Sequence, residues 1–218
     1  MWYAGGMPSS RVARFPSFLV AMAALPAQVS VSVVAATPVS VVATSGPTSN
    51  SNALPAGPLP PGLLVLSAQA AGGATSATFQ TDAVAAATGV TCSFGQGVVV
   101  GNVGDTAACA PVSLRVQFAA AAPTPVRLRV AYEDITPAGA PQPRADIDVG
   151  DDGTIDYVNG VAQGPVTLLV AGPQPLVLRV LLENALAQPG AIFSDLTVEL
   201  LPDNDVVITP AVVGCAPV

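Results

Sequence analysis

Val112-Ser-Leu-Arg-Val-Gln-Phe118 places an apolar side chain at every second position and a polar one between. This period of two is the pattern of a β-strand with one buried face and one solvent-facing face. The same spacing returns at 126–132 (VRLRVAY), 176–182 (LVLRVLL) and 196–200 (LTVEL). Such strands must bury their apolar faces against another layer, so they predict a domain built from sheets.

Shorter apolar segments lie between these strands and are separated by Gly, Pro, Asn and Asp. Many short strands joined by turns are typical of an antiparallel β-sandwich or a jelly roll. We therefore predict an all-β fold, an antiparallel sandwich of jelly-roll type, over residues 63–218. One helical turn over 82–88, capped by Asp82, is the only helix expected. The weaker strands are predicted at 63–67, 75–81, 98–100, 147–149, 154–158, 166–170 and 206–209.

The N-terminal residues 1–36 have the order of a secretory signal. Arg11 and Arg14 precede the apolar run 18–25, and small residues follow, with cleavage expected after Ala27 or Ala36. The alternative is a retained N-terminal anchor. Cleavage would leave a secreted or envelope protein without a stable membrane span. The next segment, 37–62, is rich in Pro, Ser, Thr, Ala and Gly and is predicted to be a flexible linker.

The charge distribution excludes several classes of function. The chain has 7 basic residues, all Arg, against 14 acidic ones, and its net charge is −7. An acidic protein without a basic patch repels phosphate backbones, so nucleic acid is not an expected partner. The chain has no His and, since every basic residue is Arg, no Lys. Ser-His-Asp, Cys-His and Schiff-base mechanisms are therefore closed to it.

Hydrolysis by paired carboxylates remains open. The glutamates, Glu133, Glu183 and Glu199, are predicted to be solvated residues at strand ends or on a polar face. Sugar binding usually needs an exposed aromatic ring. Tyr132 and Tyr157 fall in register with the core, so the sequence predicts no aromatic sugar platform.

Three cysteines would meet an oxidising environment after export. Cys92 and Cys109 flank the Gly-rich segment 95–104, and a disulfide between them is the first expectation. The alternative is a Cys109–Cys215 bridge, which would hold the C-terminus. The spacing fits no zinc site.

The segment 145–157 (ADIDVGDDGTIDY) predicts an acidic hairpin. A three-residue loop at 151–153 would pair Val149 with Ile155 and Ile147 with Tyr157, which places these apolar residues on one face. Asp148 would then lie opposite Asp156, and like charges across a strand pair are destabilising. A cation, Arg144 or water would have to offset the repulsion.

Counted from Asp148, the loop reads D-x-G-x-D-G-x-x-D, with Asp152 fifth and Asp156 ninth. Over about nine residues it resembles the calcium loops of integrin-like and dockerin-like modules. It departs from them at Gly150, which has no side-chain oxygen. The resemblance implies a calcium site formed by Asp146, Asp148, Asp152 and Asp156, with six to eight oxygen ligands. The alternative is an acidic turn without a metal.

The wider run D-V-G-x-D-G-T also resembles segments of uncharacterised secreted bacterial β-sandwich proteins, and this resemblance implies no activity. The expected function is a secreted non-catalytic module, structural, adhesive or binding, whose partner is extracellular or a glycan. No cofactor is expected except Ca²⁺. The alternatives are calcium-assisted glycan binding and a carboxylate-based glycoside hydrolase.

Overall fold

Strands account for nearly all regular structure in the computed structural model, which describes residues 27–60, 62–86, 89–164, 169–202 and 208–211. No helix occurs within these ranges, so they contain no helix able to cross a membrane. The prediction of an all-β fold is confirmed.

The strands form two sheets, named here sheet A and sheet B. Sheet A has ten strands: β1 (Ala27–Ala35), β2 (Val39–Ser45), β3 (Thr48–Leu54), β4 (Gly57–Pro58), β8 (Thr106–Ala120), β10 (Arg144–Val149), β11 (Tyr157–Val158), β12 (Val161–Ala162), β14 (Leu176–Leu186) and β16 (Ile208–Ala211). Sheet B has six: β5 (Leu64–Gln69), β6 (Ser76–Ala86), β7 (Gly89–Val100), β9 (Thr124–Ile135), β13 (Leu169–Ala171) and β15 (Gly190–Pro202).

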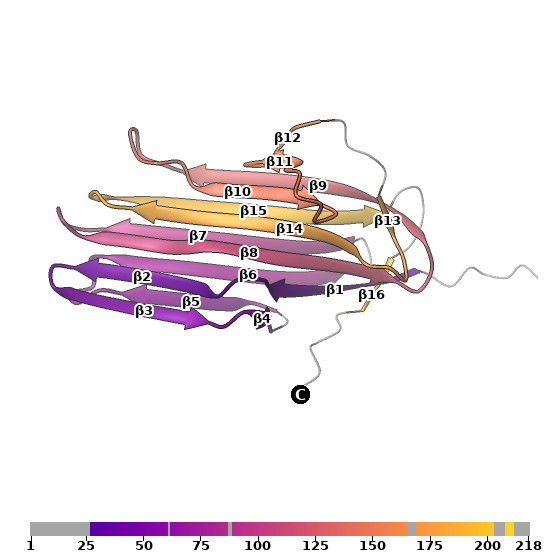
Figure 1. Ribbon diagram of the computed structural model, residues 1–218, viewed down its shortest axis with the longest axis horizontal. Helices are drawn as coiled ribbons and strands as arrows, with labels where there is room; N and C mark the ends of the chain where they lie inside the picture. Colours follow the sequence, from indigo (N-terminus) through magenta and orange to yellow (C-terminus); the bar gives the residue numbers. More distant parts are fainter. Residues whose placement is uncertain (1–26, 61, 87–88, 165–168, 203–207, 212–218) are drawn as a thin grey trace, which may run out of the picture.

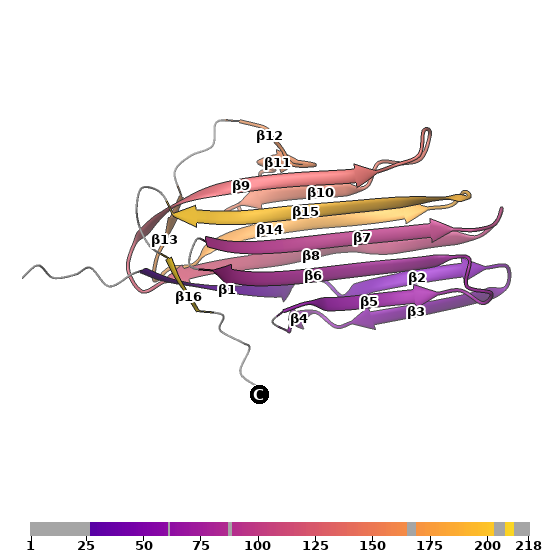
Figure 2. The same cartoon turned by 180° about the vertical axis from the view of Figure 1, so that it is seen from behind.

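The two sheets pack face to face with their long strands roughly aligned (Figures 1 and 2). Sheet B runs in the order β13-β9-β15-β7-β6-β5, and Figure 2 shows its five longer strands side by side. All pairings are antiparallel except that of β1 with β16. From β7 to β10 the chain alternates between the sheets, as in a jelly roll.

The alternating stretches supply the core between the sheets. Leu114, Val116 and Phe118 of β8 are fully buried, and the polar residues between them face outward. On sheet B, Leu196 and Val198 of β15 are buried in the same way. This is the behaviour expected of strands with a period of two, so the sandwich follows directly from the pattern.

The prediction of a linker at 37–62 is wrong. Most of this segment forms β2, β3 and β4, and Val39, Val41 and Ala43 are buried. The absence of charge resembles a linker, but β2 has the alternation VSVVA, which buries one face against sheet B. The sandwich therefore begins well before residue 63.

The boundary at residue 36 also needs correction. β1 begins at Ala27, pairs with β8, and buries Val29, Val31 and Val33. Cleavage after Ala27 would keep this strand, whereas cleavage after Ala36 would remove it. Residues 1–26, with the basic and apolar parts of the predicted signal, lie outside the described residues.

Two further expectations fail. The helical turn predicted over 82–88 is strand as far as Ala86, because β6 continues in register with β7.

The predicted disulfide between Cys92 and Cys109 is absent, since both cysteines are free and buried. The Cys109 Sγ lies 3.2 Å from the Thr78 carbonyl oxygen and 4.0 Å from that of Gly97.

Cys92 precedes Gly97 by five residues on β7, a separation of about 16 Å at the rise of a strand. A disulfide needs Cα atoms closer than about 7 Å, so the two thiols cannot pair. The alternative partner, Cys215, lies outside the described residues.

Candidate binding site

The acidic hairpin is more open than predicted. Ile147 pairs with Tyr157 as expected, but the predicted pair of Val149 with Ile155 does not form. Instead the Val149 backbone N–H donates to the Asp156 carboxylate at 2.7 Å. The chain therefore connects β10 to β11 through a longer loop, residues 150–156, here called the acidic loop.

Side-chain carboxylates organise the acidic loop. Asp148 is fully buried and accepts the backbone N–H groups of Asp152, at 3.1 Å, and of Gly153, at 2.9 Å. Asp152 accepts the N–H of Thr154 at 2.8 Å. Short polar side chains often close turns in this way, by accepting nearby backbone N–H groups. These carboxylates satisfy the backbone of a turn.

Arginine side chains form ion pairs with Asp146, just before the acidic loop, and with Asp151 within it. Arg144 donates to Asp146 at 2.5 Å, so it is not the partner that offsets the repulsion predicted between Asp148 and Asp156; those two carboxylates accept backbone N–H groups. Asp151 has a left-handed φ of 55° and places its carboxylate 2.6 Å from Arg115 Nε and 3.9 Å from Arg179 Nε. The acidic loop is thereby fastened to the outer face of sheet A.

The calcium site predicted from Asp146, Asp148, Asp152 and Asp156 does not assemble. Each carboxylate accepts a different N–H group, and no cluster of three acidic, His or Cys side chains in the described part of the chain is arranged for a metal ion. The physical reason is that Arg144 binds Asp146 while backbone N–H groups bind Asp148, Asp152 and Asp156, so the four carboxylates are held by separate donors and do not converge on one centre as Ca²⁺ would require.

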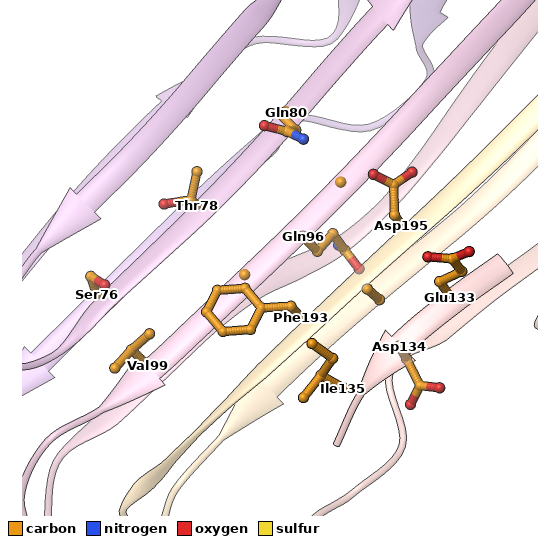
Figure 3. A pocket seen from close by; sticks show the side chains of 13 residues that line it. Ser76, Thr78, Gln80, Gln96, Val99, Glu133, Asp134, Ile135, Phe193 and Asp195 are labelled. Atoms are coloured by element: carbon orange, nitrogen blue, oxygen red, sulfur yellow. The ribbon is translucent and has the colours of Figure 1, made fainter. Parts of the chain in front are cut away.

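A hollow of about 450 Å³ lies on the opposite side of the molecule, on the outer face of sheet B. Its floor is the central strand β7, where Gly95 and Gly97 face outward and Gln96 is buried. Because these two residues have no side chains, the Gln80 side chain lies close over Gly95 and the Phe193 ring lies close over Gly97. Side chains from β6, β15 and β9 form the walls (Figure 3).

Cross-strand register arranges these walls in two rows. In the first row Thr78, Gly97, Phe193 and Ile135 lie opposite one another on four adjacent strands. In the second row Gln80, Gly95, Asp195 and Glu133 do the same. A partly apolar row therefore lies beside an acidic row. Directly opposed residues share a face of the sheet and have Cβ atoms about 5 Å apart.

Phe193 is the aromatic residue of the first row. A Cβ placed on Gly97 would lie 3.0 Å from its Cδ1 atom, so the ring rests over the glycine. The side chain is 47% exposed, and it is the sole aromatic among the exposed large apolar residues that the structure describes. Figure 3 shows the ring nearly face-on above the strands. An exposed, flat ring held over a glycine is a stacking surface.

Asp195 and Glu133 form the acidic end of the hollow. They lie opposite each other on β15 and β9, and Figure 3 shows Asp195 between Gln80 on one side and Glu133 on the other. Burial and the negative charge of Glu133 raise the pKa of Asp195, while a hydrogen bond with Thr197 acts in the other direction. Neither residue belongs to an ion pair identified within the described ranges.

The sequence prediction missed this site because the predicted strand began at Leu196, six residues after the actual start of β15. Extending the alternation backward places Phe193 and Asp195 on the polar face of β15, together with Thr197 and Glu199. The sequence alone could therefore have placed Phe193 and Asp195 on that face. It could not have predicted that Asp195 lies opposite Glu133, because no sequence pattern fixes which strands are neighbours. Tyr132 and Tyr157 do pack against the core as predicted.

Comparison with protein-family models, curated proteins and solved structures found no match. The function has to be inferred from the geometry of the hollow.

Proposed function

We propose that the protein is a secreted, non-catalytic module that binds a glycan in the hollow on sheet B. The observation that carries this proposal is Phe193, an exposed ring held over Gly97 and surrounded by hydrogen-bonding side chains. Sugars present an apolar ring face and a polar rim, so they suit an aromatic platform flanked by Thr78 and Gln80.

In this proposal the glycan binds at the hollow and not, as the sequence suggested, at a calcium ion in the acidic loop. Calcium-assisted binding would need free oxygens, and those of Asp148 and Asp152 accept backbone N–H groups. The proposed binding at the hollow uses Phe193 and its polar neighbours, without the acidic loop. The acidic surroundings disfavour phosphate-rich ligands, which supports a glycan over a nucleic acid.

The test is binding of the full chain to a panel of soluble polysaccharides, measured by calorimetry with and without a calcium chelator. The expected result is saturable binding to at least one polymer, unchanged by the chelator. Binding that disappears with the chelator would show that a metal ion is required and would favour the acidic loop as the binding site. Absence of binding to every polymer would reject the glycan proposal.

The facing carboxylates favour a second candidate, a glycoside hydrolase. Asp195 and Glu133 are opposed in register, with Cβ atoms about 5 Å apart, which allows their carboxyl groups to approach the separation of about 5 Å found in retaining glycosidases. The raised pKa of Asp195 is also the direction that a general acid needs. However, Asp195 and Glu133 stand side by side on an open face, whereas a hydrolase places its carboxylates on both sides of the scissile bond.

Release of reducing ends from a bound polysaccharide separates these two candidates. The binding proposal predicts none above the rate of a Glu133→Gln control. Release that is abolished by both Asp195→Asn and Glu133→Gln would favour the hydrolase.

A further inference from the structure

The charges around the hollow are unbalanced. Two acidic residues elsewhere on the outer faces have basic partners: Glu199 lies 3.3 Å from Arg129, and Asp151 lies 2.6 Å from Arg115. Asp195 and Glu133 face each other, and the ion pairs found in the described part of the chain include neither. Two like charges held together without a cation are destabilising, so a bound cation would stabilise them.

The apolar platform lies within reach of this charge. Phe193 and Asp195 are two residues apart on one strand and share a face, a separation of about 7 Å. That distance is comparable with the width of a sugar ring and its substituent. An occupant that uses both rows of the hollow has a flat apolar face and a positive group beside it.

We propose that the ligand of the hollow is an amino sugar, stacked on Phe193 with its ammonium group between Asp195 and Glu133. This inference rests on the proposed glycan binding and narrows it to polymers with free amines. The ammonium group would donate hydrogen bonds to both carboxylates, and charge-assisted bonds of this kind are stronger than neutral ones.

Neighbouring side chains favour a sugar over other cations. A metal ion would meet only Asp195 and Glu133, since no three acidic, His or Cys side chains in the described part of the chain are arranged to hold one. Thr78 and Gln80 wall the same hollow and offer partners for sugar hydroxyls. A lysine side chain would use the carboxylates but would leave these polar groups without partners.

The experiment compares three probes of the full chain by calorimetry: a fully deacetylated chito-oligosaccharide, the N-acetylated oligomer of the same length, and a lysine oligomer of equal charge. The expected result is at least about tenfold tighter binding of the deacetylated oligomer than of the other two, which corresponds to about 1.4 kcal/mol. Asp195→Asn and Glu133→Gln should each reduce that ratio severalfold, whereas Phe193→Ala should weaken both oligosaccharides alike.

Glu183→Gln is the matched control, because it removes one negative charge from an exposed position on sheet A. The ratio should be unchanged in this variant. An equal fall in Glu183→Gln would mean attraction to net charge alone and would overturn the inference. Equal or tighter binding of the N-acetylated oligomer would overturn it and leave glycan binding intact. Tighter binding of the lysine oligomer would also overturn it, and failure of all glycans would reject the proposed function itself.

Discussion

The Phe193 ring lies across from Gly97 and occupies the space that a larger residue at that position would need. The two residues are partners in the register of β15 and β7, and a Cβ on Gly97 would approach the ring to 3.0 Å. Glycine inside a central strand normally weakens it. Here the aromatic ring covers the exposed backbone, and the same contact fixes the ring as a platform.

Gly97→Ala tests this contact. The new methyl group must push the ring aside, so glycan affinity should fall severalfold and the variant should gain no stability. Gly164→Ala is the control, since nothing lies within 4 Å of its Cβ position. An alanine there should stabilise the protein by about 0.4–1 kcal/mol through the unfolded chain. Calorimetric melting and binding of both variants give the comparison, and equal behaviour of the two would contradict the account.

Asp195→Asn is expected to raise the melting temperature at neutral pH. The pKa of Asp195 is raised by burial and by Glu133, so its charged form is disfavoured in the folded protein. Its contribution to stability is therefore complete below the usual pKa of 3.8 and is lost as the pH rises through the folded value. The gain from the substitution should appear at neutral pH and vanish in acid.

Glu199→Gln, on the same strand, is expected to change the melting temperature in the opposite direction. Its carboxylate lies 3.3 Å from Arg129, so the loss of charge removes an attraction instead of a repulsion. Melting curves should show a small decrease at neutral pH, because exposed pairs contribute about 0.2–1 kcal/mol. A decrease of similar size in Asp195→Asn would mean that Asp195 has a favourable partner.

Asp148 is predicted to be the structural centre of the acidic loop. Asp148→Ala should lower the free energy of unfolding by about 2–4 kcal/mol, because two backbone N–H groups lose a charged acceptor. Asp152→Ala, which removes one exposed bond, should cost about 0.5–1.5 kcal/mol. Denaturant melts measure both. Excess Ca²⁺ should leave the native melting temperature unchanged, and a rise reversed by a chelator would show that the carboxylates rearrange around a metal.

Cys92 and Cys109 should resist thiol reagents in the folded protein. Burial raises the pKa of each thiol to about 12, so almost no thiolate forms near neutral pH. In a Cys215→Ser variant, native labelling should be negligible and should become complete in denaturant. A peptide linking Cys92 to Cys109 in a non-reducing digest would contradict the separation of their strands.

The sequence predicted the fold class because alternation is a local property. Val112 to Phe118 and Leu196 to Leu200 alternate in the structure as they do in the sequence. The acidic loop was predicted in place but with the wrong loop length, because Asp148 and Asp156 take backbone N–H groups that a tight hairpin would have used. The hollow depends on which strands are neighbours, and that relationship comes only from the assembled sheets.

Binding at the hollow is tested directly by the affinity of Phe193→Ala for the polysaccharide that the native protein binds best. Val158→Ala is the control, because Val158 is 41% exposed and lies on sheet A, away from the hollow. Phe193→Ala should bind at least about tenfold more weakly, which corresponds to about 1.4 kcal/mol, and the control should bind with unchanged affinity. Equal affinity of Phe193→Ala and the native protein would contradict the claim that the hollow on sheet B is the binding site.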